Sequence, residues 1–129
     1  MDLYSPEWIS AFNDVVSHLP SDPDVSFRMV QVVRDAQGGT FEIALDVREG
    51  RVRMASPPEE GPAPEVTVSI SYADALALSS GETDPSTLLT HGKVRVRGDL
   101  SVLVRANAIM AEAAGRLSDE DRPATTSAT

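Results

Sequence analysis

The side chains best suited to metal or acid–base chemistry are few in this sequence. The chain has two histidines, His18 and His91, and no cysteine. The histidines are not spaced as paired metal ligands, and no cysteine can complete a zinc site. Each falls near the end of a predicted helix, where a cationic side chain interacts favourably with the helix dipole. The pattern therefore favours a capping role for both, and predicts no metal site and no catalytic residue.

Other chemical motifs are also weak. The sequence has no Gly-x-Ser-x-Gly nucleophile motif. Gly38-Gly39 is typical of a turn, because the Gly-Lys-Ser/Thr of a phosphate loop does not follow. The acidic residues Glu59-Glu60 and those at 119–121 lack the spacing of a calcium loop. We interpret them as solvated charge.

Basic side chains gather on the predicted strands. Most occupy the polar phase of an alternating pattern, so cross-strand ion pairs are the simplest interpretation. A basic sheet face that contacts a membrane or an acidic protein is the alternative. The set comprises Arg28, Arg48, Arg51, Arg53, Lys93, Arg95 and Arg97.

Size and charge limit the classes of function. The 129 residues suit one domain, and 41% of them are hydrophobic, as in ordinary globular proteins. The formal charge of −9 argues against a nucleic-acid partner, because phosphate is repelled. No apolar run reaches the length of a membrane span, and the N-terminus does not resemble a signal peptide. We expect a cytoplasmic location.

Ten arginines against one lysine suggest a bacterial source.

The elements follow from local patterns. Ser5-Pro6-Glu7 predicts a helix start, and an apolar stripe continues to Leu19. The period then changes to two, which predicts an antiparallel three-strand meander over residues 25–54. The alternation slips at Met29-Val30, which indicates either a bulge or a strand buried on both faces.

The second half alternates strands and helices. Residues 66–70 form a predicted strand, and Ser71 and Asp84-Pro85 each predict a short helix. A fifth strand at 93–97 precedes the longest helix, whose apolar face ends at Leu117. The pattern predicts a layered α+β domain over 1–117, with helices on one sheet face and water on the other, and a disordered acidic and polar tail over 118–129.

The stretch from Ser71 to Leu117 resembles the sterol carrier protein type two family of lipid-binding domains. The matching segments are Ser71-Tyr72-Ala73-Asp74-Ala75-Leu76-Ala77-Leu78, then Gly81, Asp84-Pro85, and Gly92-Lys93 through Gly98-Asp99-Leu100. Leu88-Leu89 and Asp99 depart from the residues common in the family. The resemblance implies a five-stranded mixed sheet, helices that enclose an apolar tunnel, and binding of sterols, fatty acids or related lipids without a metal or cofactor.

The resemblance also implies that some apolar residues otherwise expected in the core line the wall of a cavity. Met110 can adapt to varied apolar partners, and Asn107 can orient a ligand hydroxyl or carboxyl or bond the backbone. The candidates are Phe27, Phe41, Ile43, Leu45, Met54, Val68, Val94, Val96, Leu100, Leu103, Val104, Asn107 and Met110.

The leading hypothesis is non-catalytic binding or transfer of an apolar ligand, and two alternatives stay open. The same cavity could hold a hydrophobic biosynthetic intermediate for an enzyme or chaperone, with Asp99 or Tyr72 as the polar group. The domain could instead serve protein interaction or dimerisation. The sequence does not fix the oligomeric state or the ligand.

Overall fold

A computed structural model of the chain describes residues 2–19 and 22–127, with side chains as far as residue 117. The side chains of residues 118–129, over which we predict a disordered tail, lie outside that description. The elements are α1 (Pro6–Ser17), β1 (Phe27–Arg34), β2 (Thr40–Arg48), β3 (Arg51–Ala55), β4 (Val66–Ser71), α2 (Tyr72–Ser80), α3 (Pro85–Thr90), β5 (Arg95–Gly98) and α4 (Leu100–Ser127).

Local capping chemistry fixes where three of the helices begin. The side chain of Ser5 accepts a hydrogen bond from the Trp8 N–H, and Ser71 and Asp84 do the same for Asp74 and Thr87. Each bond satisfies an N–H group that has no partner inside its helix. The predicted starts of α1, α2 and α3 are therefore confirmed.

The strands form one mixed sheet in the order β3-β2-β1-β4-β5. Strands β1, β2 and β3 pair antiparallel, as the predicted meander requires. Strand β1 also pairs with β4 in parallel, and β5 closes the other edge antiparallel to β4. The α+β fold class with a five-stranded mixed sheet is confirmed.

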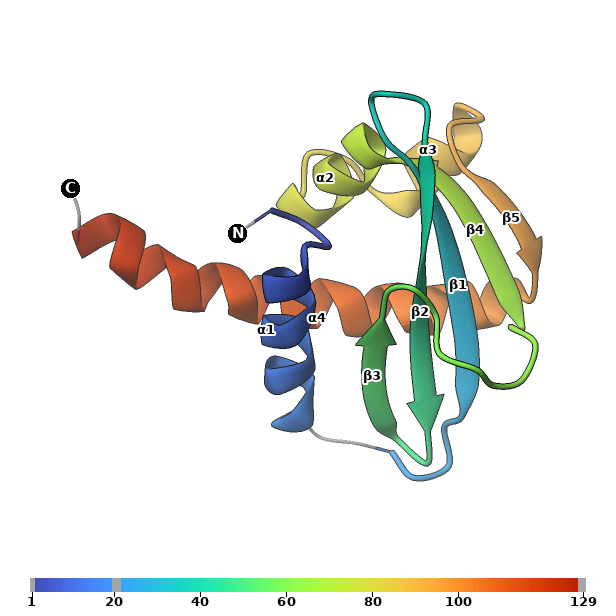
Figure 1. The fold of residues 1–129 in the computed structure, drawn as a ribbon, viewed down its shortest axis with the longest axis horizontal. Coiled ribbons are helices and arrows are strands. Elements are labelled where there is room, and N and C mark those ends of the chain that lie inside the picture. Colours follow the sequence, from blue (N-terminus) through green and yellow to red (C-terminus); the bar gives the residue numbers. More distant parts are fainter. Residues whose placement is uncertain (1, 20–21, 128–129) are drawn as a thin grey trace.

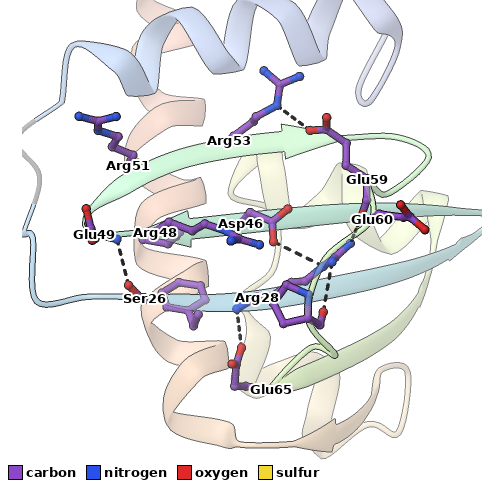
Figure 2. A pocket seen from close by; sticks show the side chains of 13 residues that line it. Ser26, Arg28, Asp46, Arg48, Glu49, Arg51, Arg53, Glu59, Glu60 and Glu65 are labelled. Atoms are coloured by element: carbon purple, nitrogen blue, oxygen red, sulfur yellow. Dashed lines mark hydrogen bonds and ion pairs between the residues drawn. The ribbon is translucent and has the colours of Figure 1, made fainter.

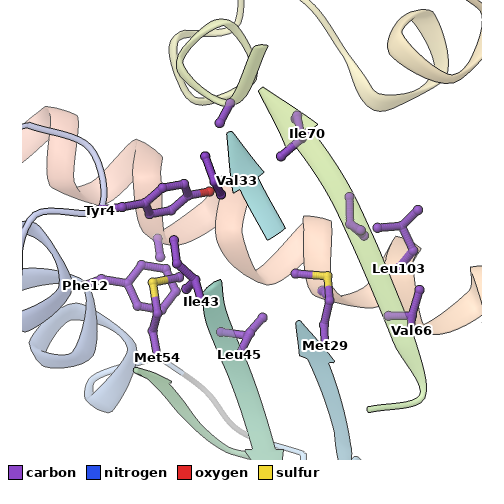
Figure 3. Close-up of a cluster of buried hydrophobic side chains, with 14 of the residues drawn as sticks. Tyr4, Phe12, Met29, Val33, Ile43, Leu45, Met54, Val66, Ile70 and Leu103 are labelled. Atoms are coloured by element: carbon purple, nitrogen blue, oxygen red, sulfur yellow. The ribbon is translucent and has the colours of Figure 1, made fainter. Parts of the chain in front are cut away.

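The helices cover one face of this sheet. Helix α4 contacts β1 and β4, α1 contacts β3 and α4, and α2 contacts β4 and β1. Figure 1 shows α4 crossing behind the strands with α1 beside it. Side chains of alternate strand residues, among them Met29, Ile43, Leu45, Met54 and Val66, point from the sheet into this layer (Figure 3).

Strand β1 is buried on both faces. Phe27, Met29 and Val33 lie on the helix side, while Arg28 and Val30 are also buried on the opposite side. The register with β2 is continuous from Phe27 to Arg34, so the slip in the sequence pattern reflects two-sided burial. The connection between β3 and β4 covers part of the outer face, which corrects the expectation that this whole face meets water.

Gly98 sits where β5 turns into α4. Its φ of +114° is in the region that disfavours side chains, and an added Cβ would overlap the carbonyl oxygen of Glu65. The same carbonyl accepts a hydrogen bond from the Asp99 N–H at 2.9 Å. The close approach sets the position from which α4 starts.

We predict that Gly98→Ala destabilises the fold far more than Gly81→Ala. Gly81 also has positive φ, at +81°, but a Cβ there meets open space. Gly81→Ala should cost roughly 1 kcal/mol of unfolding free energy, and Gly98→Ala at least about twice that because strain and overlap combine. Urea unfolding measures both, and equal losses would show that the approach to Glu65 does not constrain the fold.

Candidate functional site

An apolar cleft opens on the helix side of the sheet. Its volume is about 760 Å³. The N-terminal segment, α1, the end of α2 and α4 form its walls, and β1 and β4 form its floor. The lining residues are Leu3, Tyr4, Trp8, Gln31, Ile70, Ala75, Leu78, Ser79, Ser80, Gly81, Thr83, Asp84, Pro85, Val104, Asn107, Ala108, Met110, Ala111, Ala114 and Gly115.

Small residues of α4 leave the space open. Ala108, Ala111, Ala114 and Gly115 line the cleft along this helix, and none of them has a side chain long enough to fill it. At the opposite wall the ring of Tyr4 meets Trp8 edge to face, with centroids 5.3 Å apart. The result is a cleft of the size and apolar character usual for small-molecule sites.

The floor of the cleft contains one buried amide, Gln31. Its register partners on the same sheet face are Ile43 and Val68, so it interrupts an apolar row. Its Oε1 accepts a hydrogen bond from the Tyr4 hydroxyl at 2.9 Å, while its Nε2 lies 3.9 Å from the Met110 sulfur. Because a thioether is a weak acceptor, the amide N–H groups lack a strong partner within the described residues.

Two titratable groups at the cleft have shifted pKa values. Burial strongly raises the pKa of Tyr4, partly offset by its bond to Gln31, so this hydroxyl stays a donor at any ordinary pH. The pKa of Asp84 is lowered because its carboxylate accepts hydrogen bonds from Thr87. Asp84 is therefore charged at neutral pH.

The predicted wall residues divide into groups. Val104, Asn107 and Met110 line the cleft. Phe27, Ile43, Leu45, Met54, Val68 and Leu103 are buried in the core, and Phe41, Val94 and Val96 pack partly buried against it. Leu100 is 58% exposed and does not line the cleft.

Several lining residues were missed by the sequence analysis. Leu3, Tyr4 and Trp8 reach the cleft because the N-terminal segment folds back on the sheet, which no local pattern predicts. Gln31 did carry a signal, since a polar residue at an apolar phase of a buried strand indicates a special role. The hydroxyl of Tyr72 donates to the Leu3 carbonyl oxygen and so anchors this segment.

The polar residues considered for acid–base or metal chemistry in the sequence analysis, Asp99, Tyr72 and the two histidines, lie outside the cleft. Asp99 accepts hydrogen bonds from Ser101 next to the start of α4, and neither Asp99 nor Tyr72 lines the cleft. The Nδ1 atoms of His18 and His91 each lie 2.9 Å from a backbone carbonyl oxygen of their own helix. Among the described residues, no three metal-ligating side chains gather.

A second, charged cleft of about 890 Å³ lies on the outer sheet face. Figure 2 shows its centre, where the guanidinium of Arg28 lies under the connection between β3 and β4. Its Nη atoms donate to the carbonyl oxygens of Pro62 at 3.1 Å and Glu59 at 2.6 Å, and its Nε is 3.4 Å from Asp46. Arg28 therefore fastens the connection to β1 and β2.

The other outer arginines are differently placed. Arg53 pairs with Glu59 at 2.7 Å in an exposed position, whereas Arg48 and Arg51 face each other across the β2–β3 hairpin. Carboxylates of Asp46, Glu49, Glu59, Glu60 and Glu65 line the same cleft. This mixture of arginines and carboxylates suits ion pairing within the cleft better than capture of an anion. Contact of the strand arginines with a membrane or an acidic protein stays a prediction.

The architecture defines a class: a single layered α+β domain with an apolar cleft between one sheet face and its helices. A sequence profile of the SCP-2 sterol transfer family matches residues 24–111. The chain belongs to this family. No curated protein matches the sequence at a significant level.

Solved structures share the fold at low sequence identity. A crystal structure of sterol carrier protein 2 superposes with a TM-score of 0.64 at 14% identity, covering 88% of this chain and 95% of that one. Palmitated SCP2L2 from Aedes aegypti gives 0.59 at 20% identity, covering 81% and 88%. Sterol carrier protein 2 from Yarrowia lipolytica, in its apo form, gives 0.58 at 15% identity, covering 87% and 83%.

None of the described helices has both the length and the apolar character needed to cross a bilayer.

We predict that Arg28→Met loosens the β3–β4 connection. The substitution leaves Asp46 and two carbonyl groups without their buried partner, so the unfolding free energy should fall by roughly 3 kcal/mol. The matched control is Arg53→Met, whose pair with Glu59 is exposed and worth at most about 1 kcal/mol. Urea unfolding and limited proteolysis of residues 57–64 test this. If the two variants behave alike, Arg28 is not the fastening residue.

Proposed function

We propose that this protein binds an apolar small molecule in the cleft between α2, α4 and the N-terminal segment, and carries it without chemical change. Family membership supports lipid binding or transfer as the general function. The cleft of about 760 Å³, lined largely by apolar and small residues, is the observation that supports this location.

Hydrophobic burial would supply the affinity. Each Å² of apolar ligand surface removed from water contributes roughly 25 cal/mol. The alanine-rich wall of α4 and the flexible side chain of Met110 can follow ligands of different shape.

The structure offers a built-in reporter of occupancy. Trp8 is the single tryptophan of the chain, and it lines the cleft. A ligand that replaces water beside its ring should change the intensity and wavelength of its fluorescence. Titration of the unlabelled protein with apolar ligands therefore measures binding directly, alongside native mass spectrometry of the purified protein.

We predict that filling the cleft from α4 abolishes binding. Ala111→Phe/Gly115→Phe adds two rings on one helix face inside the cleft, and the affinity for any apolar ligand should fall at least about tenfold because the space is lost. The matched control is Arg105→Phe/Glu112→Phe, which adds the same rings to exposed positions of α4 that do not line the cleft.

Circular dichroism checks that both variants keep the fold. Equal affinities in the two double variants would place the ligand elsewhere. A wild-type protein that binds no fatty acid, sterol or other apolar probe would contradict the proposed function itself.

A further inference from the structure

We infer that the cleft selects an uncharged ligand whose apolar body carries a hydrogen-bond-accepting oxygen, such as an alcohol, ketone or ester, over a carboxylate or phosphate ester. The inference rests on the proposed function and names the chemical class of its ligand. Three features of the cleft wall carry it: its charge, the Gln31 amide and the Asn107 amide.

The charge of the wall disfavours anions. Among the residues that the structure describes, no lysine, arginine or histidine lines the cleft, whereas the carboxylate of Asp84 does. The whole chain has a formal charge of −9. A buried anion needs a counter-charge or several donors to offset lost hydration. A fatty acid anion would find no cation among the described lining residues, and the net negative charge of the chain would repel it at long range.

Gln31 supplies a neutral donor at the floor of the cleft. Gln31 is 7% exposed, and the bond from Tyr4 occupies its Oε1 and directs the amide N–H groups away from that hydroxyl. Their partner is the sulfur of Met110 at 3.9 Å. Because a methionine side chain moves easily and accepts weakly, a ligand oxygen can replace it and form the stronger bond.

Asn107 gives a second neutral polar group at the same cleft. It lies half-buried on α4, one turn from Met110. The structure gives its side chain no hydrogen bond within the described residues. The wall therefore offers amide groups to a ligand oxygen where an anion site would offer guanidinium or ammonium groups. An uncharged polar end satisfies these amides without the cost of a buried charge.

The test compares ligands of equal chain length. 1-Dodecanol, dodecanoate and dodecane are titrated at pH 8 into the full chain, with Trp8 fluorescence and displacement of the neutral dye Nile red as readouts. We expect dodecanol to bind at least about tenfold more tightly than dodecanoate. Equal or tighter binding of dodecanoate overturns the inference while leaving the proposed function intact. If none of the three binds, the inference is overturned, whereas the proposed function fails only if sterols and other apolar probes do not bind either.

A charge variant tests the first feature. Val104 lines the rim of the cleft and is 68% exposed, so a lysine fits there without burial of its ammonium group. Val104→Lys should raise the affinity for dodecanoate several-fold relative to Val104→Gln, which separates the charge from the loss of the valine methyl groups. An unchanged ratio between these two variants would contradict the role given to charge.

A polar variant tests the amide. Tyr4→Phe/Gln31→Leu removes the buried amide together with the hydroxyl that bonds it, so no polar atom of this pair is left unsatisfied. Relative to Tyr4→Phe alone, the preference for dodecanol over dodecane should fall about fivefold, the worth of one hydrogen bond. If the preference persists in the double variant, Gln31 does not receive the ligand oxygen.

Discussion

Strand β1 has to be covered on both faces, and the rest of the molecule is arranged to meet that requirement. On the outer side, the connection from β3 to β4 crosses the sheet and is held down by the guanidinium of Arg28. On the inner side, α1 and α4 cover the apolar row of β1 and its neighbours. The cover is incomplete beside Gln31, where residues of α4 with short side chains line the open space, and this gap is the cleft.

The two sides of the sheet differ in how they use polar groups. The outer cleft balances arginines against carboxylates, so its polar groups chiefly satisfy one another. In the inner cleft, the Tyr4 hydroxyl satisfies one end of the Gln31 amide and leaves the other end to a thioether. A buried amide in that state favours a ligand oxygen over an empty site, since unsatisfied donors are costly. The proposed ligand preference therefore depends on one residue of the central strand.

Local chemistry made much of the fold predictable. Ser5, Ser71 and Asp84 predict the starts of their helices because capping depends on neighbours a few residues away. The parallel pairing of β1 with β4 was not predictable from local chemistry, because β2 and β3 separate these two strands in the sequence. Only the family resemblance implied a mixed sheet. The cleft was predictable in part: α4 was expected as one wall, and Val104, Asn107 and Met110 lie there. The opposite wall, from Leu3 to Trp8, depends on tertiary contacts that leave no periodic signal in the sequence. Because β1 is buried on both faces, its sequence does not alternate cleanly between apolar and polar residues, and the unusual position of Gln31 on the helix-facing side was not recognised.

The proposed function puts the apolar ligand between α4 and the N-terminal segment. Intermolecular nuclear Overhauser effects between a bound long-chain alcohol and the protein methyl groups test it most directly. We expect contacts to the methyl groups of Met110, Ala111 and Ala114, and to the ring of Trp8. Contacts to Val30 and Val32 on the outer sheet face, with none to α4, would contradict it.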